Sequence, residues 1–113
     1  MTEKHIMLKN FLKNLTQIKE ATLEQRKKEI WDVEGILHGF SNQILKFDLR
    51  PHKEFKTGFF KSIADKIVFE NGKEWIVFDV GELHPYLKNN NIKDVYIHEL
   101  VKELDYTIII EKN

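Results

Sequence analysis

The sequence predicts an α+β fold in a single domain, residues 1–113. A central, mostly antiparallel sheet of about five strands is expected, with N-terminal helices on one face and a C-terminal helical segment on the other. Three observations predict this fold: helical spacing of apolar residues near the N-terminus, strict alternation in the middle, and two runs of β-branched and aromatic residues around Asn71-Gly72. At 113 residues the chain is long enough to bury a core without disulfides.

The segment from Lys66 to Val80 is predicted to form a hairpin at the centre of this sheet. Asn71-Gly72 favours a type I′ turn with a two-residue loop, which would place Val68 opposite Trp75. Facing side chains share one side of a sheet, so both sides of this hairpin are apolar. One side carries Ile67, Phe69, Ile76 and Phe78, and the other carries Val68, Trp75 and Val77. A hairpin of this kind is expected to be covered on both sides.

Two helices are predicted before the sheet. Residues 5–19 carry apolar side chains at helical spacing, so an amphipathic helix is expected to pack there on the sheet. Thr22 and Gln25 have the spacing of a capping box and predict the start of a second helix. Its apolar side is expected to continue to Leu37, and Gly39 is expected to cap its C-terminal end.

Strands are predicted to follow. Leu45 to Arg50 alternates apolar and polar residues, which indicates a half-exposed strand. Its solvent face would carry Lys46, Asp48 and Arg50. Pro51 is expected to end this strand because proline has no N–H to donate. Residues 54–63 are also strand-like, with Gly58 as a candidate bulge.

A helix is predicted after the hairpin. Asp79 to Glu82 gives a helix-start signal, and Pro85 would fit only near the first turn. The three asparagines at 89–91 are expected to end this helix at about Lys88.

Residues 94–104 have two interpretations. Asp94 could cap a helix, whereas the β-branched and aromatic residues from Val95 to Ile97 favour a strand. Tyr106 to Ile110 then predicts a closing, well-buried strand.

The composition limits the classes of function. The absence of cysteine excludes disulfides, thiolate zinc sites and cysteine nucleophiles. The charged N-terminal residues and the lack of a long apolar run argue against a signal peptide or membrane span, so a soluble cytoplasmic protein is expected. The five histidines lack metal-ligand spacing and neither serine lies in a nucleophile elbow, so no metal or cofactor is predicted.

Charge is unevenly distributed although the net charge is zero. Residues 1–66 hold 13 Lys and Arg against 9 Asp and Glu, a net +4, and residues 67–113 hold 5 against 9, a net −4. Head-to-tail association of opposite halves into a homo-oligomer is one expectation. The alternative is that the opposite charges meet within one folded domain and cancel.

The candidate enzymatic site is that of a metal-dependent nuclease, which needs two carboxylates on adjacent strands and a nearby lysine. Asp65 and Asp79 are expected at the same end of the hairpin, and Glu34 could supply a third carboxylate. The segment ADKIVFENGKEWIVFDVG and the order α-β-β-β-α-β resemble the core of the PD-(D/E)xK nuclease family over about half of the chain. The resemblance implies metal-dependent cleavage, but Gly81 stands where the family has its lysine. A helix cap is the alternative role for Asp79.

Nucleic-acid binding without catalysis is a second candidate. The stretch from Lys46 to Lys66 is basic and contains interleaved phenylalanines, which suits a sheet that stacks on single-stranded bases. The residues predicted to make these contacts are Arg50, Lys53, Lys56, Phe59 and Lys61.

The function favoured by the sequence is non-catalytic binding of a macromolecular partner, with protein ahead of nucleic acid. Inhibitors, immunity proteins and assembly factors act through surfaces that leave no motif, because hot spots are a few exposed aromatic or Arg residues. The candidate interface residues are Trp31, Tyr86 and Tyr96.

Overall fold

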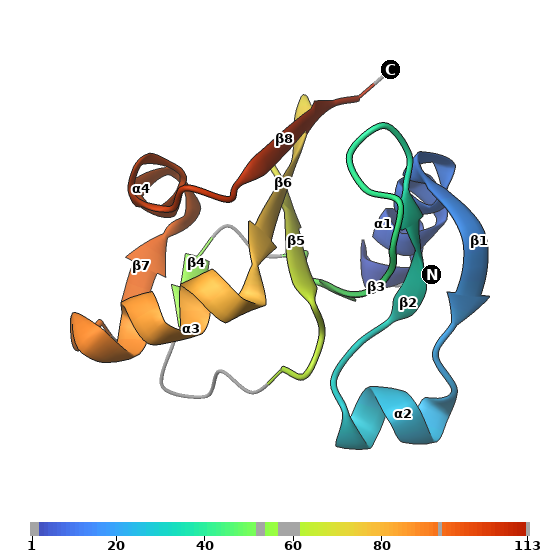
Figure 1. Ribbon diagram of the computed structural model, residues 1–113, viewed down its shortest axis with the longest axis horizontal. Helices are drawn as coiled ribbons and strands as arrows, with labels where there is room; N and C mark the ends of the chain where they lie inside the picture. Colours follow the sequence, from blue (N-terminus) through green and yellow to red (C-terminus); the bar gives the residue numbers. More distant parts are fainter. Residues whose placement is uncertain (1–2, 52–53, 57–61, 93, 113) are drawn as a thin grey trace.

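The computed structural model describes residues 3–51, 54–56, 62–92 and 94–112 (Figure 1). Within these residues, helices and strands are interspersed along the chain. In chain order the elements are α1 (Glu3–Phe11), the 3₁₀ turn η1 (Leu12–Asn14), β1 (Leu15–Glu20), α2 (Leu23–Lys28), β2 (Val33–Leu37), β3 (Ile44–Leu49), β4 (Glu54–Lys56), β5 (Lys66–Glu70), β6 (Glu74–Asp79), α3 (Val80–Asn89), β7 (Asp94–Tyr96), α4 (Ile97–Glu103) and β8 (Ile108–Glu111).

Six of the described strands form one curled, mixed sheet in the order β1-β2-β3-β5-β6-β8. Neighbouring strands in this sheet are antiparallel, except that β3 and β5 are parallel. β4 and β7 form a separate antiparallel pair. The predicted α+β class with a mostly antiparallel central sheet is confirmed.

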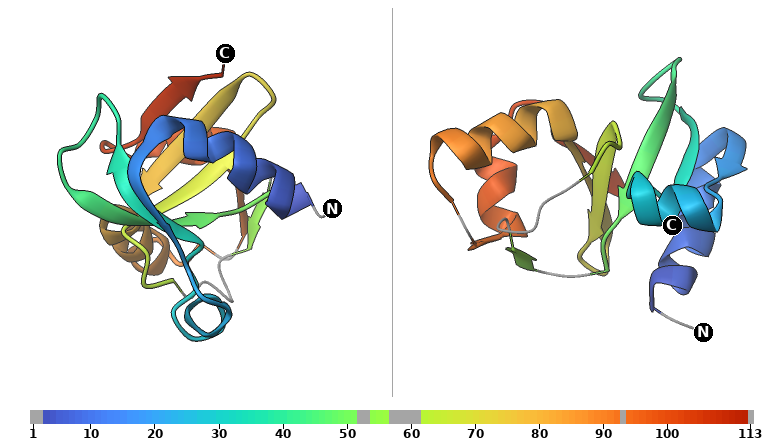
Figure 2. Two further views of the ribbon diagram at one scale, coloured as in Figure 1. Left: turned by 90° about the vertical axis from the view of Figure 1, so that its right-hand side faces the viewer. Right: turned by 90° about the horizontal axis from the view of Figure 1, so that it is seen from below.

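Two hydrophobic clusters cover the two faces of the β5–β6 hairpin. On one face the Phe11 ring of α1 lies edge-on to Phe47 and Trp75, with centroids 5.4 and 5.2 Å away. Figures 1 and 2 show α1 on this side of the sheet and α3 with α4 on the other. The α1 cluster contains the buried residues Met7, Leu8, Phe11, Leu15, Val33, Leu37, Phe47, Leu49, Val68, Trp75 and Val77. The α4 cluster contains Ile67, Phe69, Ile76, Phe78, Leu83, Leu87, Ile97, Leu100 and Leu104.

The hairpin has the predicted faces but a different register. Every residue assigned to a face lies in the expected cluster, so the prediction of a ribbon covered on both sides is confirmed. Val68, however, pairs with Val77 rather than with Trp75, which is a shift of two residues. The Asn71 carboxamide oxygen accepts hydrogen bonds from the N–H groups of Lys73 and Glu74. This side-chain turn lengthens the loop and replaces the expected type I′ turn.

The N-terminal helix is shorter than predicted. It ends at Phe11, and Leu15–Glu20 forms β1, which pairs with β2. Gln17 adopts a φ of 53°, and the pairing register shifts between Thr16 and Lys19, which marks a bulge. The spacing of Leu15 and Ile18 matched a helical stripe, but Ile18 is exposed, so the two residues do not share a buried face.

The capping box at Thr22 and Gln25 is confirmed, because each side chain accepts a hydrogen bond from the other residue's N–H. The helix that it starts ends at Lys28, and the prediction that it continues to Leu37 is wrong. Val33–Leu37 is a strand in which alternate residues are buried. Gly39, with a φ of 85°, lies in the β2–β3 connection and caps no helix.

The strand predicted from Leu45 to Arg50 is confirmed as β3, with one correction. Asp48 was expected on the solvent face but is 1% exposed, and Arg50 donates two hydrogen bonds to its carboxylate, at 3.0 and 2.8 Å. A charged donor close to both carboxylate oxygens satisfies the buried charge. Of the strand predicted at 54–63, Glu54–Lys56 is strand β4, Ser62 and Ile63 lie in no strand, and Gly58 lies outside the described residues.

The helix predicted after the hairpin is α3, and Asp79 caps it by accepting a hydrogen bond from the N–H of Glu82. Pro85 is the sixth helical residue, so its expected place near the first turn is wrong. Proline there removes a hydrogen bond to the carbonyl of Gly81, and Gly81 is exposed, so water can take that bond.

Both interpretations of residues 94–104 are partly confirmed. Asp94–Tyr96 is a strand, and a helix begins at Ile97 with Tyr96, not Asp94, at its N-cap. The last strand was expected to be well buried, but β8 lies at the edge of the sheet and Ile109 is 44% exposed. Among the described helices, none has the length and apolar character needed to cross a membrane.

Candidate functional site

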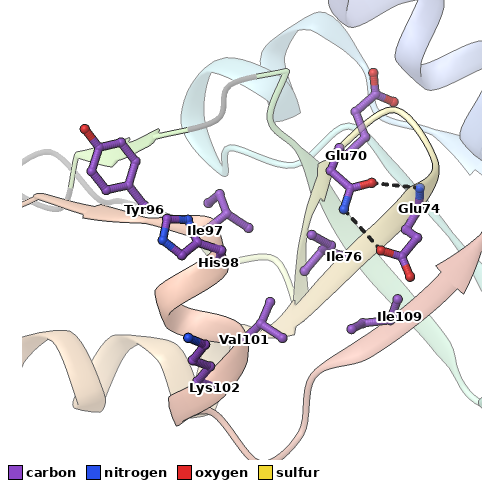
Figure 3. A pocket seen from close by; sticks show the side chains of 10 residues that line it. Glu70, Glu74, Ile76, Tyr96, Ile97, His98, Val101, Lys102 and Ile109 are labelled. Carbon is purple, nitrogen blue, oxygen red and sulfur yellow. Dashed lines mark hydrogen bonds between the residues drawn. The ribbon is translucent and has the colours of Figure 1, made fainter.

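A groove of about 580 Å³ opens on the α4 side of the sheet, between the turn of the β5–β6 hairpin, β8 and α4 (Figure 3). We call it the α4 groove. Its apolar lining includes Ile76 from β6, Val101 from α4 and Ile109 from β8. Tyr96, His98 and Lys102 line it on the α4 side, and Glu70, Asn71 and Glu74 line it at the hairpin turn.

Local sequence explains why these side chains meet. Ile76 and Ile109 are directly opposite each other in the β6–β8 ladder, so they share the face that α4 covers. Ile97, Leu100 and Leu104 fix α4 by packing into the α4 cluster. These residues bury one face of α4, and the half-buried Val101 lies beside that face, at the groove.

The rim of the groove carries an aromatic pair. The rings of Tyr96 and His98 are stacked, with centroids 5.7 Å apart and an angle of 19° between their planes. Tyr96 is 51% exposed although it is one of the larger apolar side chains of the chain. An exposed aromatic side chain next to an apolar groove is typical of a binding surface.

The hairpin end of the groove is acidic. Glu74 and Glu111 are directly opposite each other across β6 and β8, on the groove face of the sheet. The Glu74 carboxylate accepts a hydrogen bond from the side chain of Asn71 at 3.1 Å. Within the described part of the chain, no ion pair involves either glutamate. Like charges in this arrangement repel each other.

The backbone of β8 presents an unused hydrogen-bonding edge. The N–H of Lys112 donates to the carbonyl of Lys73, directly opposite on the β6 side. Backbone N–H and C=O groups alternate in direction along an antiparallel strand. Those of Ile108 and Ile110 therefore also point toward β6, and those of Ile109 and Glu111 point away from it. Among the described strands, none pairs with that outer edge. Unpaired groups on a straight, aliphatic edge are a template for another strand.

The opposite edge of the sheet differs. β1 carries the bulge at Gln17 and is exposed from Thr16 to Glu20, with Lys19 within it. Bulges and lysines are the features by which sheet edges avoid pairing with other chains. The β8 strand, with the sequence Ile-Ile-Ile-Glu, has no bulge and no lysine, and its one charged residue is Glu111 at its end. Of the two edges of this sheet, β8 is therefore the one suited to accept a strand.

Comparisons with known proteins returned no match, whether with protein-family models, with curated proteins or with solved structures. What this surface can bind therefore has to follow from its own geometry and charge.

The candidate nuclease residues are only partly brought together. Asp65 and Asp79 lie at the same end of the hairpin, where the N–H of Val80 donates to the Asp65 carbonyl. Their carboxylates are engaged separately: that of Asp65 accepts from the N–H of Lys46, and that of Asp79 caps α3 and pairs with Lys66 at 3.1 Å.

The third candidate carboxylate does not join them. Glu34 lies on β2, which β3 separates from the hairpin. In the described part of the chain, no three His, Asp or Glu residues are grouped so that they could hold a metal ion. The lysine near Asp79 was missed from the sequence because Lys66 faces Asp79 only in the observed register.

The candidate nucleic-acid residues fall largely outside the described structure. Lys53, Phe59 and Lys61 are not described, and Lys56 is described only as part of strand β4. Arg50 is half-buried beside Asp48, so its guanidinium is engaged within the fold.

The three candidate interface residues lie in different surroundings. Trp31 is 2% exposed, and the Lys46 ammonium lies over its ring, 5.0 Å from the centroid. Tyr86 is half-buried against the α4 cluster. Tyr96 alone of the three is exposed, and it lies at the α4 groove.

Sequence reasoning missed Val101, Ile109 and Glu111 as surface residues. Ile109 was assigned to a buried strand because an apolar run gives no sign of whether a strand is central or at an edge. The one available signal was Glu111, a charge that ends the run and is common on edge strands.

Proposed function

We propose that this protein is a non-catalytic binding module that accepts an extended segment of a different protein as an additional strand on the outer edge of β8. Alternate side chains of that segment would lie next to Ile109 and enter the α4 groove. This mode of recognition suits an inhibitor, an immunity protein or an assembly factor, each of which acts by occupying a partner.

The observation that supports the proposal is the combination of an open aliphatic strand edge with an apolar groove on the same strand. Main-chain hydrogen bonds from Ile109 and Glu111 supply affinity in strand addition, and the groove supplies selectivity for side chains. Each such hydrogen bond contributes about 1 kcal/mol, and burial of one large apolar side chain contributes about 1.5–3 kcal/mol. After the costs of association, a dissociation constant on the order of micromolar is expected.

The test starts with a partner purified by affinity capture from the native host and then produced in recombinant form. Calorimetric titration of the two pure proteins compares the wild type with Ile109→Lys, which places a charge on the edge. Loss of affinity by about tenfold or more is expected. Ile18→Lys is the matched control, because Ile18 is 45% exposed on the opposite edge strand and should leave the affinity unchanged.

Hydrogen exchange distinguishes strand addition from side-chain contact. In the free protein the outward N–H groups of Ile109 and Glu111 should exchange faster than those of Ile108 and Ile110. On binding, the two outward amides should become protected. Unchanged exchange at both amides, or a loss of affinity in Ile18→Lys but not in Ile109→Lys, would remove the proposal. A dimer in sedimentation that Ile109→Lys abolishes would show that the occupant is a second copy instead.

A further inference from the structure

The ladder on the groove face of β8 combines one apolar and one acidic position. The Ile76–Ile109 pair is followed, two residues along each strand, by the Glu74–Glu111 pair. Both are non-hydrogen-bonded pairs, in which the backbone N–H and C=O groups of the two residues point away from each other. Facing side chains are closest in pairs of this kind. Two glutamate side chains thus face each other beside an apolar pair.

Within the described part of the chain, no lysine or arginine forms an ion pair with Glu74 or Glu111. Lys73 and Lys112 are the lysines next to the pair in sequence, and the Lys112 ammonium is 3.0 Å from the Glu70 carboxylate and 4.4 Å from the centroid of the Trp75 ring. Lys13 of the 3₁₀ turn η1 lines a pocket with Glu111 and Lys112 but forms no ion pair with Glu111. Lys102 lines the groove from α4, on the opposite wall. A cationic group that arrives with the partner would therefore meet two carboxylates that form no ion pair within the described residues.

A strand paired with β8 has its own side chains in register with this ladder. Residues that point to the same face are two apart in sequence. The partner residue that lies beside Glu111 is therefore two positions from the residue that lies beside Ile109.

Resting on the proposed function, we infer that the partner segment is an extended strand, uncharged except for one Lys or Arg that lies two positions from a bulky apolar residue. The apolar side chain packs between Ile109 and Val101 in the α4 groove. The cation lies against Glu111 and Glu74. The segment belongs to a different protein, since β1 of this chain carries a bulge and, on β8 of a second copy, the residues two positions from Ile109 are Thr107 and Glu111, neither of which is a cation.

The probes are four sets of immobilised nonapeptides, each with two fixed positions that are two residues apart. One fixed position is Lys or Glu, the other is Ile or Asn, and the remaining positions are a mixture of Thr, Val, Gln and Ser. Each set is made with the fixed residues in both orders, because the partner strand can pair with β8 in either direction. Retention of the purified, fluorescently labelled full chain is measured at moderate salt. The Lys–Ile set should retain about fivefold more protein than either the Glu–Ile or the Lys–Asn set.

Charge reversal supplies the second readout. Glu111→Lys should invert the preference, so that the Glu–Ile set is retained about fivefold better than the Lys–Ile set. Glu103→Lys is the matched control, since Glu103 is an exposed α4 residue that does not line the groove and changes the net charge equally. It should leave the wild-type preference in place.

The outcomes separate the two proposals. Equal retention of the Lys–Ile and Glu–Ile sets, above the Asn sets, would overturn the cation requirement and leave strand addition standing. A preference that Glu103→Lys inverts as well as Glu111→Lys would also overturn it, because net charge would then explain the result. If no set is retained better than peptides with a central proline, which cannot add as a strand, the proposed function itself fails.

Discussion

At the scale of single residues, Gly35 shows how the sheet depends on one missing methyl group. It is buried in β2, and a Cβ built on it would lie 2.9 Å from the backbone carbonyl oxygen of Thr16. That oxygen belongs to β1 just before the bulge, so the backbone itself would have to move. Gly35 therefore sets the distance between β1 and β2.

Replacement of Gly35 by alanine should destabilise the protein by about 1–3 kcal/mol, the usual cost of overpacking a close contact. Urea unfolding followed by tryptophan fluorescence measures this change. Gly39→Asn is the control: Gly39 has a φ of 85° but open space around it, and asparagine tolerates this backbone conformation. A Gly35→Ala protein as stable as the wild type would mean that β1 can shift outward at no cost.

The two buried aspartates show what the sequence could not reveal at this scale. Alternation correctly placed Lys46, Asp48 and Arg50 on one face of β3, but it says nothing about what lies over that face. Asp32 is 3% exposed, accepts a hydrogen bond from the N–H of Leu49 at 2.8 Å and pairs with Lys4 of α1 at 3.1 Å. Its partners lie 17 and 28 positions away in sequence (49 − 32 and 32 − 4), and only the tertiary fold brings them together.

At the scale of elements, Asp79 joins the end of β6 to the start of α3. One carboxylate oxygen caps the helix through the N–H of Glu82, and the other pairs with Lys66 of β5. The nuclease hypothesis needs this carboxylate for a metal ion, whereas the structure uses both of its oxygens to fix a helix on a hairpin. The sequence allowed both roles, because a cap and a metal ligand use the same residue type.

We expect Asp79→Ala to lower the free energy of unfolding by about 1–2 kcal/mol, since it removes the cap and leaves Lys66 without its partner. Asp79→Ser keeps a capping oxygen and loses only the charge, so it should recover about half of the lost stability. Urea titrations monitored by circular dichroism measure both variants. If Asp79→Ser were as unstable as Asp79→Ala, the ion pair rather than the cap would hold α3.

The hairpin register explains why its faces were predicted correctly and its turn was not. Side chains in a strand repeat every two residues, so a shift of two moves no side chain to the other face. The error at Asn71-Gly72 therefore left both clusters as predicted. A shift of one would have moved Trp75 from the α1 cluster to the opposite face.

The site was less predictable than the fold for a related reason. Whether a strand is central or at an edge depends on which strands become its neighbours, and β8 pairs with β6 only after the chain has passed through α3, β7 and α4. The groove in turn needs α4 placed over this pair. Local patterns predict elements and faces, but the open edge of β8 and the position of Ile109 follow from the order of strands in space.

At the scale of the whole molecule, the β5–β6 hairpin connects the two clusters. Val68, Trp75 and Val77 belong to the α1 cluster, while Ile67, Phe69, Ile76 and Phe78, which alternate with them along the two strands, belong to the α4 cluster. Neither cluster can lose its packing without exposing one face of the same ribbon. The two clusters are therefore expected to unfold together as one cooperative unit.

Two large-to-small substitutions test this coupling from opposite sides. Phe11→Ala empties a site in the α1 cluster, and Leu100→Ala empties one in the α4 cluster; both side chains are fully buried. Losses of about 3–5 and 2–5 kcal/mol are expected. Each variant should show one transition in urea, with the same midpoint by tryptophan fluorescence, which reports on Trp31 and on Trp75 in the α1 cluster, and by circular dichroism at helical wavelengths. Ile44→Ala, at a side chain 53% exposed, should stay within about 0.5 kcal/mol of the wild type. If Leu100→Ala lost its helical signal at a lower urea concentration than its fluorescence signal, α3 and α4 would form a separate unit, and the groove that α4 borders could open while the rest of the sheet stays folded.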